Sequence, residues 1–174
     1  MLGLANSLAG GSALSKFSEY SLYLDGSDEY LSIADNDKLT PNSSGGNRGF
    51  SISFWIKPAD TGGEYILNRS GVWYSGANHY EYMLQLNWQT KLVVNFYGDD
   101  DADIWQKLIL DDALTPGTWY HIVFTYDLGS SNTSIKAYLN GVEKTHGSGA
   151  AYTSNGTWAA IVNTSQVLTV AKFG

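Results

Sequence analysis

Apolar and polar side chains alternate with a period of two through most of the chain, and a helical spacing of 3.6 residues is hardly sustained anywhere. The stretch "YHIVFTY" from Tyr120 to Tyr126 shows the pattern clearly, because every second residue is aromatic or aliphatic. The positions between them carry His121, Val123 and Thr125. This alternation predicts a strand with one side toward a core and the other toward a second surface.

Ten segments of this kind, separated by turn residues, are predicted as strands. They are "YSLYLD" near Tyr20, "YLSIA" from Tyr30, "FSISFWIK" from Phe50, "YILNR" from Tyr65, "YEYMLQLNW" from Tyr80, "KLVVNFY" from Lys91, "IWQKLIL" from Ile104, "WYHIVFTYD" from Trp119, "SIKAYLN" from Ser134 and "VLTVAKF" from Val167. In "IWQKLIL", Ile104 and Leu108 would also share a helical face, but the neighbouring segments favour a strand. Residues 128–134 and most of 145–166 are rich in Ser, Thr, Gly and Asn and are predicted as loops.

Turn-forming dipeptides separate the strands, and Asn140-Gly141 between "KAYL" and "VEKT" is the strongest of them. Both central positions of a type I′ turn require a positive φ, which Asn and Gly adopt readily. Short strands, tight turns and no helical crossovers predict an all-β fold, with antiparallel strands in a sandwich or barrel. One domain is expected over residues 19–174, preceded by an arm or leader at 1–18.

Composition narrows the classes of partner. There are 17 acidic and 10 basic residues, and the basic ones are dispersed singly, so no basic patch could follow a nucleic acid backbone. Six aspartates and one lysine fall between Asp99 and Asp112, so much of the net charge of −7 is local. The chain has no cysteine for a disulfide, and no apolar stretch is long enough for membrane insertion.

Four motifs in order, "SLYLDGSDEYLSI", "FSISFWIKP", "LTPGTWYHIVFTYD" and "SIKAYLNGV", resemble the laminin-G-like (LamG) members of the concanavalin A-like lectin and glucanase superfamily. The resemblance spans about Tyr20 to Phe173, nearly the whole chain. It implies a jelly-roll sandwich of two antiparallel sheets, with a binding site on the concave face or along the rim.

The opening "MLGLANSLAGG", which runs directly into "SEYSLYLDGSDEYLSI", also resembles laminin-G-like structural proteins of tailed bacteriophages. This implies a virion protein that acts in decoration, fibre or adhesion and has weak glycan affinity, with other virion or fibre subunits as partners in an oligomeric assembly. The alternative is a carbohydrate-binding module of a secreted, extracellular bacterial protein, with cell-surface glycans as partners. Family members continue past a segment like "LTVAKFG" into a last strand. The end at Gly174 therefore predicts either a shortened sequence or an edge that a neighbouring chain covers.

The acidic residues argue against catalysis. Glucanases use two carboxylates, which lie about 5 Å apart in retaining enzymes. The glutamates are Glu19, Glu29, Glu64, Glu81 and Glu143, and none belongs to a Glu-x-Asp-x-x-Glu cluster. We therefore expect a non-enzymatic protein without catalytic residues, and keep a divergent glycoside hydrolase as a third alternative.

Calcium is a candidate cofactor, because it binds about six to eight oxygen ligands that loops can supply. Asp99, Asp101 and Asp103 alternate in "GDDDADIW", which lacks the glycine and the distal glutamate of an EF-hand. The resemblance implies calcium near a rim, where Asp25 and Asp28 of "DGSDEY" offer a rival location. Asp25 alternatively serves only the turn that follows it.

Aromatic residues in loop-like sequence indicate a contact surface, since flat rings stack against the C–H groups of sugars and are also enriched at protein interfaces. The stretch 71–82 is rich in such rings and in small residues. The predicted binding residues, for a glycan or a partner protein alike, are Trp73, Tyr74, His79, Tyr80, Trp105 and Trp158. The strand aromatics predicted to pack the core instead are Phe50, Phe54, Trp119, Phe124 and Tyr138.

Overall fold

The computed structural model describes residues 20–24, 29–41, 49–70, 80–98, 104–127 and 129–171, and it confirms the predicted all-β fold. Its strands are β1 (Leu31–Ile33), β2 (Phe50–Ile56), β3 (Glu64–Ser70), β4 (Tyr80–Leu86), β5 (Lys91–Tyr97), β6 (Trp105–Ala113), β7 (Tyr120–Tyr126), β8 (Ile135–Leu139), β9 (Val142–His146), β10 (Gly149–Asn155) and β11 (Leu168–Val170). One 3-10 helix, η1 (Asp37–Leu39), follows β1.

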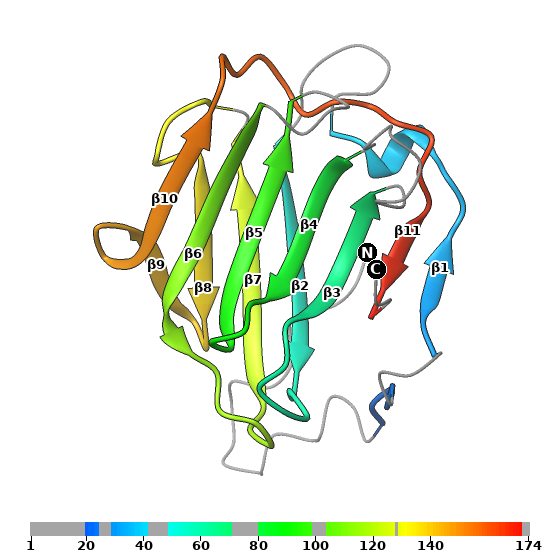
Figure 1. Cartoon of the computed structure of the whole chain (residues 1–174), viewed down its shortest axis with the longest axis vertical. Coiled ribbons are helices and arrows are strands. Elements are labelled where there is room, and N and C mark those ends of the chain that lie inside the picture. The colour runs from blue at the N-terminus through cyan, green and yellow to red at the C-terminus, as the bar shows by residue number, and fades with distance from the viewer. Residues whose placement is uncertain are drawn as a thin grey trace, which may run out of the picture.

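The strands form one curled sheet in the order β1-β11-β3-β4-β5-β6-β10-β9-β8-β7-β2. The first seven strands in this order are layer A, and β9, β8, β7 and β2 are layer B. The two layers lie face to face, with the centre of layer A in front of layer B in Figure 1. The pairs are antiparallel except β9 with β10, where the chain passes from one layer to the other. This is the predicted jelly-roll sandwich.

The core lies between the layers because alternate residues of facing strands point inward. Along β7, the even positions Ile122, Phe124 and Tyr126 are buried and the residues between them are half-buried, as predicted. Facing them across the core are Leu84 of β4 and Phe96 of β5. The ring of Phe96 stacks on Tyr126 with centroids 4.8 Å apart, which ties the two layers together.

The predicted hairpin is confirmed. Asn140 and Gly141 have φ values of 51° and 82°, and they join β8 to β9. Asn140 also fixes the start of β7, because its Oδ1 accepts from the His121 amide at 2.9 Å while its own amide donates to the His121 carbonyl at 2.8 Å.

Two segments differ from prediction. Residues 149–155 were expected to be loop, but they form β10, which pairs antiparallel with Trp105 to Leu110 of β6. The composition of this segment led to a wrong prediction, because the strand is held by backbone pairing to β6. Residues 20–24, predicted as a strand, form none, and Tyr20 is 89 % exposed.

Two of the predicted core aromatics are also placed differently. Trp119 immediately precedes β7 and is 47 % exposed. Tyr138 lies on the side of β8 opposite the buried Ala137 and Leu139, so it faces outward. Phe50 and Phe54 pack against the core and Phe124 lies within it, as predicted. The odd positions of β7 and the even positions of β8 therefore belong to the outer surface of layer B.

The sandwich is open at one side among the described residues. Layer A contains seven strands and layer B four, and β1 and β2 are the terminal strands of the sheet. The groove next to β2 has a volume of about 990 Å³, and its walls include Phe50, Ile52, Leu67 and Leu168. The inward side chains of β2 are accordingly half-buried, whereas those of the central strand β7 are mostly buried.

Candidate functional site

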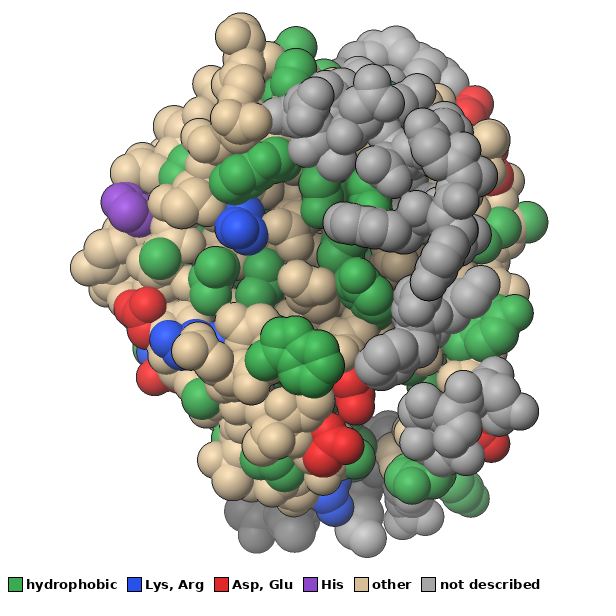
Figure 2. Space-filling view, viewed as in Figure 1, with side chains coloured by type: hydrophobic (Ala, Val, Ile, Leu, Met, Phe, Trp, Pro, Cys, Tyr) green, Lys and Arg blue, Asp and Glu red, His purple; other side chains and the backbone are tan. Residues whose placement is uncertain are grey.

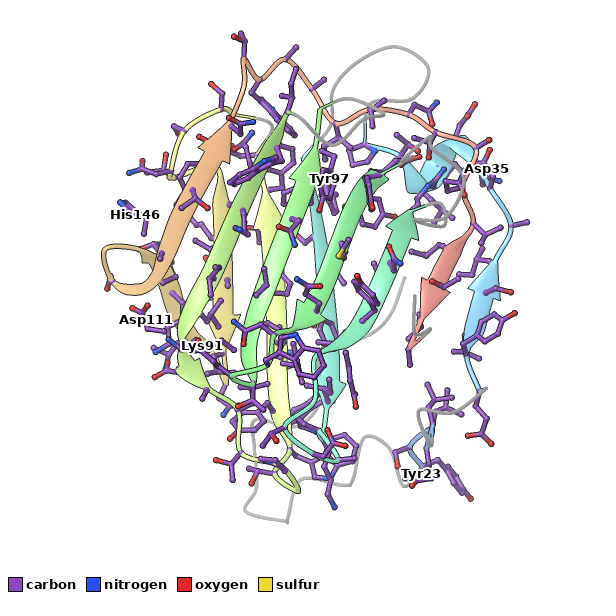
Figure 3. All side chains as sticks on the ribbon, viewed as in Figure 1. Tyr23, Asp35, Lys91, Tyr97, Asp111 and His146 are labelled. Atoms are coloured by element: carbon purple, nitrogen blue, oxygen red, sulfur yellow. The ribbon has the colours of Figure 1, made fainter. Side chains whose placement is uncertain are left out.

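An aromatic row crosses the outer side of layer A at one end of β4, β5 and β6. It consists of Tyr80, Tyr97 and Trp105, which we call row 1. Tyr80 stacks on Tyr97 with ring centroids 4.9 Å apart and an interplanar angle of 30°. Tyr97 is in turn the register partner of Trp105. Figure 3 labels Tyr97 near the upper end of the front layer, whereas Lys91, at the other end of β5, lies near the bottom.

A β-bulge places Tyr80 in this row. Arg69 pairs with Tyr82 and Ser70 with Tyr80, so Glu81 is an extra residue in β4. A bulge of this kind re-aims the side chains beside it. Tyr82 consequently points into the core while Tyr80 contacts Tyr97 on the outer side.

Row 1 is recessed at one end and accessible at the other. Tyr80 is 5 % exposed, whereas Tyr97 and Trp105 are half-buried. Burial raises the pKa of Tyr97, and the neighbouring Tyr80 and Tyr65 act in the same direction. Burial likewise raises the pKa of Tyr80, with Tyr65 contributing. The phenol groups therefore stay protonated and can donate hydrogen bonds at neutral pH.

A second row, mostly polar, lies beside row 1, two residues away from it along β5 and β6. It contains Asn68, Met83, Asn95 and Lys107, paired in that order across β3, β4, β5 and β6, and we call it row 2. The ammonium of Lys107 lies 4.8 Å from the centroid of the Trp105 ring. The side-chain oxygen of Asn68 is buried and has no hydrogen-bond partner among the described residues. Amide, ammonium and aromatic groups thus share one side of layer A, the face seen in Figure 2, where a basic side chain lies among hydrophobic ones.

A buried charge network supports this end of layer A. Arg69 and Glu81 are both fully buried, with Nε and Oε1 3.0 Å apart. Glu81 also accepts from the Thr164 amide at 2.7 Å and from the Thr40 hydroxyl at 2.9 Å. Burial raises the pKa of Glu81, while these hydrogen bonds and the Arg69 charge oppose that shift. Arg69 also pairs with Asp35, so the network joins η1, β3, β4 and residues 161–167.

The predicted binding residues separate into three groups. Tyr80 and Trp105 are brought together in row 1, although Tyr80 lies in a strand and is nearly inaccessible. Trp158 is partly buried: it packs against the core, and its indole donates to the Tyr126 hydroxyl at 2.9 Å. Its role in binding stays a prediction. Trp73, Tyr74 and His79 lie outside the described residues.

The calcium ligands predicted from the sequence, Asp99, Asp101, Asp103, Asp25 and Asp28, also lie outside the described residues. Within the ranges that the structure describes, no group of three or more His, Asp or Glu side chains could hold a metal ion. Calcium therefore stays a prediction.

The carboxylates that the structure describes lie apart from row 1 or are already bound. Glu81 is held by Arg69, Thr164 and Thr40, as described above. Glu143 accepts from the Tyr138 hydroxyl at 3.1 Å on the outer side of layer B. Glu64 and Asp60 lie close together near the start of β3, where burial, followed by the Asp60 charge, raises the pKa of Glu64. No pair of described carboxylates faces row 1.

Several members of the two rows were missed by sequence reasoning. Tyr97, Asn95 and Lys107 lie in regular alternating strands, and nothing in their local sequence separates a binding side from a solvent side. The alternation in "KLVVNFY" does place Tyr97, Asn95 and Val93 on the side opposite Phe96 and Val94. Their relation to Trp105 depends on the register between β5 and β6, which the sequence does not encode locally.

Aromatic side chains combined with a few polar groups are typical of ligand-binding sites in general. A family model, Laminin_G_3, described as the concanavalin A-like lectin/glucanases superfamily, matches residues 19–169. The chain therefore belongs to this family, as the four sequence motifs predicted. A comparison with curated proteins found no match. The described residues contain no helix of the length and apolarity needed to span a membrane.

Proposed function

We propose that the protein is a non-enzymatic carbohydrate-binding module of the laminin-G-like type, and that rows 1 and 2 of layer A hold the glycan. The observation that supports this most directly is the juxtaposition of Trp105, Tyr97 and Lys107 on one side of β5 and β6. A pyranose ring presents C–H groups on its face and hydroxyls around its edge. Stacked aromatic rings flanked by amide and ammonium donors complement both features.

The accessible end of row 1 determines how a sugar would approach. Trp105 and Lys107 are half-buried, so they would meet the ligand before the buried Tyr80. Lys107 already lies close to the Trp105 ring. A hydroxyl of the sugar could accept from the ammonium while the ring stacks on the indole. Asn95, 7 % exposed, is the register partner of Lys107 and would be the next polar group along row 2 to contact the ligand.

The described carboxylates favour binding over hydrolysis. A glycosidase needs an acid and a nucleophile or base on either side of the scissile bond. Asp60 and Glu64 are close enough to interact, but they lie near the start of β3, whereas row 1 lies at the ends of β4 and β5 away from the β4–β5 turn. Release of reducing sugar from a panel of β-glucans by the purified protein would contradict the non-enzymatic proposal.

A glycan array tests the proposal, followed by calorimetry with the oligosaccharide that binds best. We expect saturable binding, and a several-fold to about tenfold loss of affinity in Trp105→Ala, since stacking contributes about 0.5–1.5 kcal/mol. Trp88→Ala is the matched control, because Trp88 is 82 % exposed in the β4–β5 turn, away from row 1. Equal affinity of both variants for the best ligand would refute row 1 as the site.

A second candidate is a subunit role in a virion or fibre, alone or together with glycan binding. The open groove beside β2 favours it, because a terminal strand with half-buried apolar side chains can pair with a strand of a neighbouring subunit. The proposed location is then the virion; for the free module it is the extracellular space.

Hydrogen exchange at increasing protein concentration tests the subunit role. Amides of Phe50–Ile56 should become more protected as the protein assembles, while those of the central strand β5 stay unchanged. A monomeric mass at every concentration, together with absence of the protein from purified phage particles by mass spectrometry, would eliminate the subunit role.

A further inference from the structure

The outer side of layer B carries a second aromatic surface, remote from rows 1 and 2. It is formed where β2 and β7 pair, with Trp55 opposite His121 and Ser53 opposite Val123. These residues alternate with the inward Phe54 and Ile122, so they face away from the core. Trp119 precedes β7, two positions before His121, and extends the same outward side.

Trp55 is the more exposed of the two tryptophans of this surface. It is 65 % exposed, although it lies within a regular antiparallel strand pair. Trp119 is 47 % exposed. Two exposed tryptophans on the same outward side of one strand pair form a cluster, and clustered apolar exposure is typical of contact surfaces, unlike the single exposed ring of Trp88.

The Trp55 ring is held in place. It stacks on the His121 ring with centroids 5.0 Å apart and an interplanar angle of 29°. The His121 Nε2 lies 3.0 Å from the Ser53 hydroxyl, and the His121 backbone is bonded in both directions by Asn140. The indole is therefore a pre-organised flat platform, which lowers the entropic cost of binding.

The surroundings of Trp55 suit a sugar better than a protein subunit. Its neighbours along β2 on the outer side are polar, namely Ser51, Ser53 and the exposed Lys57, while Val123 of β7 lies opposite Ser53. Further along the same side, Glu143 accepts from Tyr138 and pairs with Lys136 at 3.5 Å. Stable subunit interfaces have a continuous apolar centre. Isolated indoles bordered by hydroxyl and charged groups match the face and edge of a pyranose ring instead.

We infer that the outer side of β2 and β7 is a second carbohydrate-binding site, in which one pyranose ring stacks on Trp55 and a neighbouring ring contacts Trp119. Because layers A and B are the two faces of a sandwich, the two sites point in opposite directions. The protein could then engage two glycan chains at once, and a polymer bound at both sites would gain avidity. This inference does not require the layer A site to exist.

Titration followed by NMR distinguishes the two sites in one experiment, because each tryptophan has its own indole N–H signal. The signals are assigned with single Trp→Phe variants, and the probes are cellohexaose, xylohexaose, mannohexaose and laminarihexaose. We expect at least one probe to shift the Trp55 and Trp119 signals in a saturable way while the Trp88 signal stays fixed. The Trp55 shift should persist in Trp105→Ala, and the Trp119 shift should weaken or disappear in Trp55→Ala.

Each result decides one site or the other. Loss of the Trp105 shift alone removes the layer A site and leaves this inference standing. Fixed Trp55 signals with all four probes would overturn the inference, as would a Trp55 shift that vanishes in Trp105→Ala. A Trp55 signal that moves with protein concentration in the absence of sugar would overturn it as well, because it would assign the surface to a second copy of the chain.

Discussion

The outer sides of layers A and B both carry stacked aromatic rings, but these rings differ in how far they are exposed to solvent. On layer A, Tyr80 and Tyr97 stack on one another, and Tyr80 is nearly inaccessible. On layer B, Trp55 stacks on His121 but stays largely exposed. Row 1 on layer A therefore contains a ring that is almost completely buried, whereas the layer B surface presents an exposed ring on a regular strand pair.

The difference originates in backbone register. On layer A, the bulge at Glu81 turns a carboxylate inward to meet Arg69 and leaves Tyr80 on the outer side. On layer B, β2 and β7 pair over seven consecutive residues without a register shift, so simple alternation sets every side chain. A binding surface on layer A thus depends on an irregularity, and one on layer B does not.

The largest expected effect comes from removing the buried carboxylate of layer A. Glu81→Ala leaves the fully buried Arg69 without its buried carboxylate partner, which costs about 3–5 kcal/mol of stability. Glu143→Ala is the control on layer B, because its pair with Lys136 is half-exposed and contributes less than about 1 kcal/mol. Urea denaturation of both variants gives the comparison, and equal losses would contradict the structural role assigned to the network.

Buried tyrosines should make the protein sensitive to alkali. Burial raises the pKa of Tyr82 to about 12. The unfolded chain releases this proton near pH 10, so the stabilisation is complete below about pH 10 and is lost as the pH rises toward 12. At about pH 11 the loss is about 1 kcal/mol for this tyrosine.

Tyr82→Phe checks the alkaline effect, because the variant has no proton to release at this position. We expect it to lose about 1 kcal/mol less stability than the wild type between pH 9 and pH 11, measured by urea denaturation at each pH. Parallel losses in the two proteins would show that Tyr82 is not the source of the pH dependence.

Lysine substitutions compare glycan binding on the two layers. Lys107→Met should weaken binding at layer A several-fold, since it removes a donor and a cation close to Trp105 worth about 0.5–1 kcal/mol. Lys136→Met, on the outer side of layer B, should leave affinity at the Trp105 site unchanged. Calorimetry with the best array ligand measures both, and a larger loss in Lys136→Met would reverse the assignment of sites.

A small stabilisation is expected from Glu64→Gln. The pKa of Glu64 is raised by burial and then by Asp60, so its contribution to stability is complete at acidic pH and is lost as the pH rises through its folded pKa. Removing the charge should raise stability at pH 7 by a few tenths of a kcal/mol, or about 1 °C in Tm. Differential scanning calorimetry at pH 7 and pH 4 checks this, and a gain that is larger at pH 4 would contradict the sign.

The sequence predicts most of the fold because alternation and turn chemistry are local. "YHIVFTY" shows which side of β7 is buried, and Asn140-Gly141 locates the hairpin. β10 escaped prediction because "GAAYTSN" has weak strand composition and depends on β6 for pairing. Trp119 was placed in the core although its outward position follows from the same alternation as His121.

The candidate site could be predicted only in part, because most of its residues are brought together by pairing between strands. Trp105 and Tyr80 could be chosen as aromatic residues near loop-like sequence, but Tyr97, Lys107 and Asn95 join them through strand register. The hydrogen bond from Trp158 to Tyr126 is a long-range contact that the local sequence does not reveal. The pairing of Arg69 with Glu81 likewise follows from a bulge that local sequence does not reveal.

A crystal structure of the protein with the best oligosaccharide from the glycan array tests the central claim most directly. The account predicts an intact oligosaccharide with one pyranose ring stacked on Trp105 and a hydroxyl within hydrogen-bond distance of Lys107. A cleaved sugar, or a ligand that contacts neither Trp105 nor Tyr97, would contradict it.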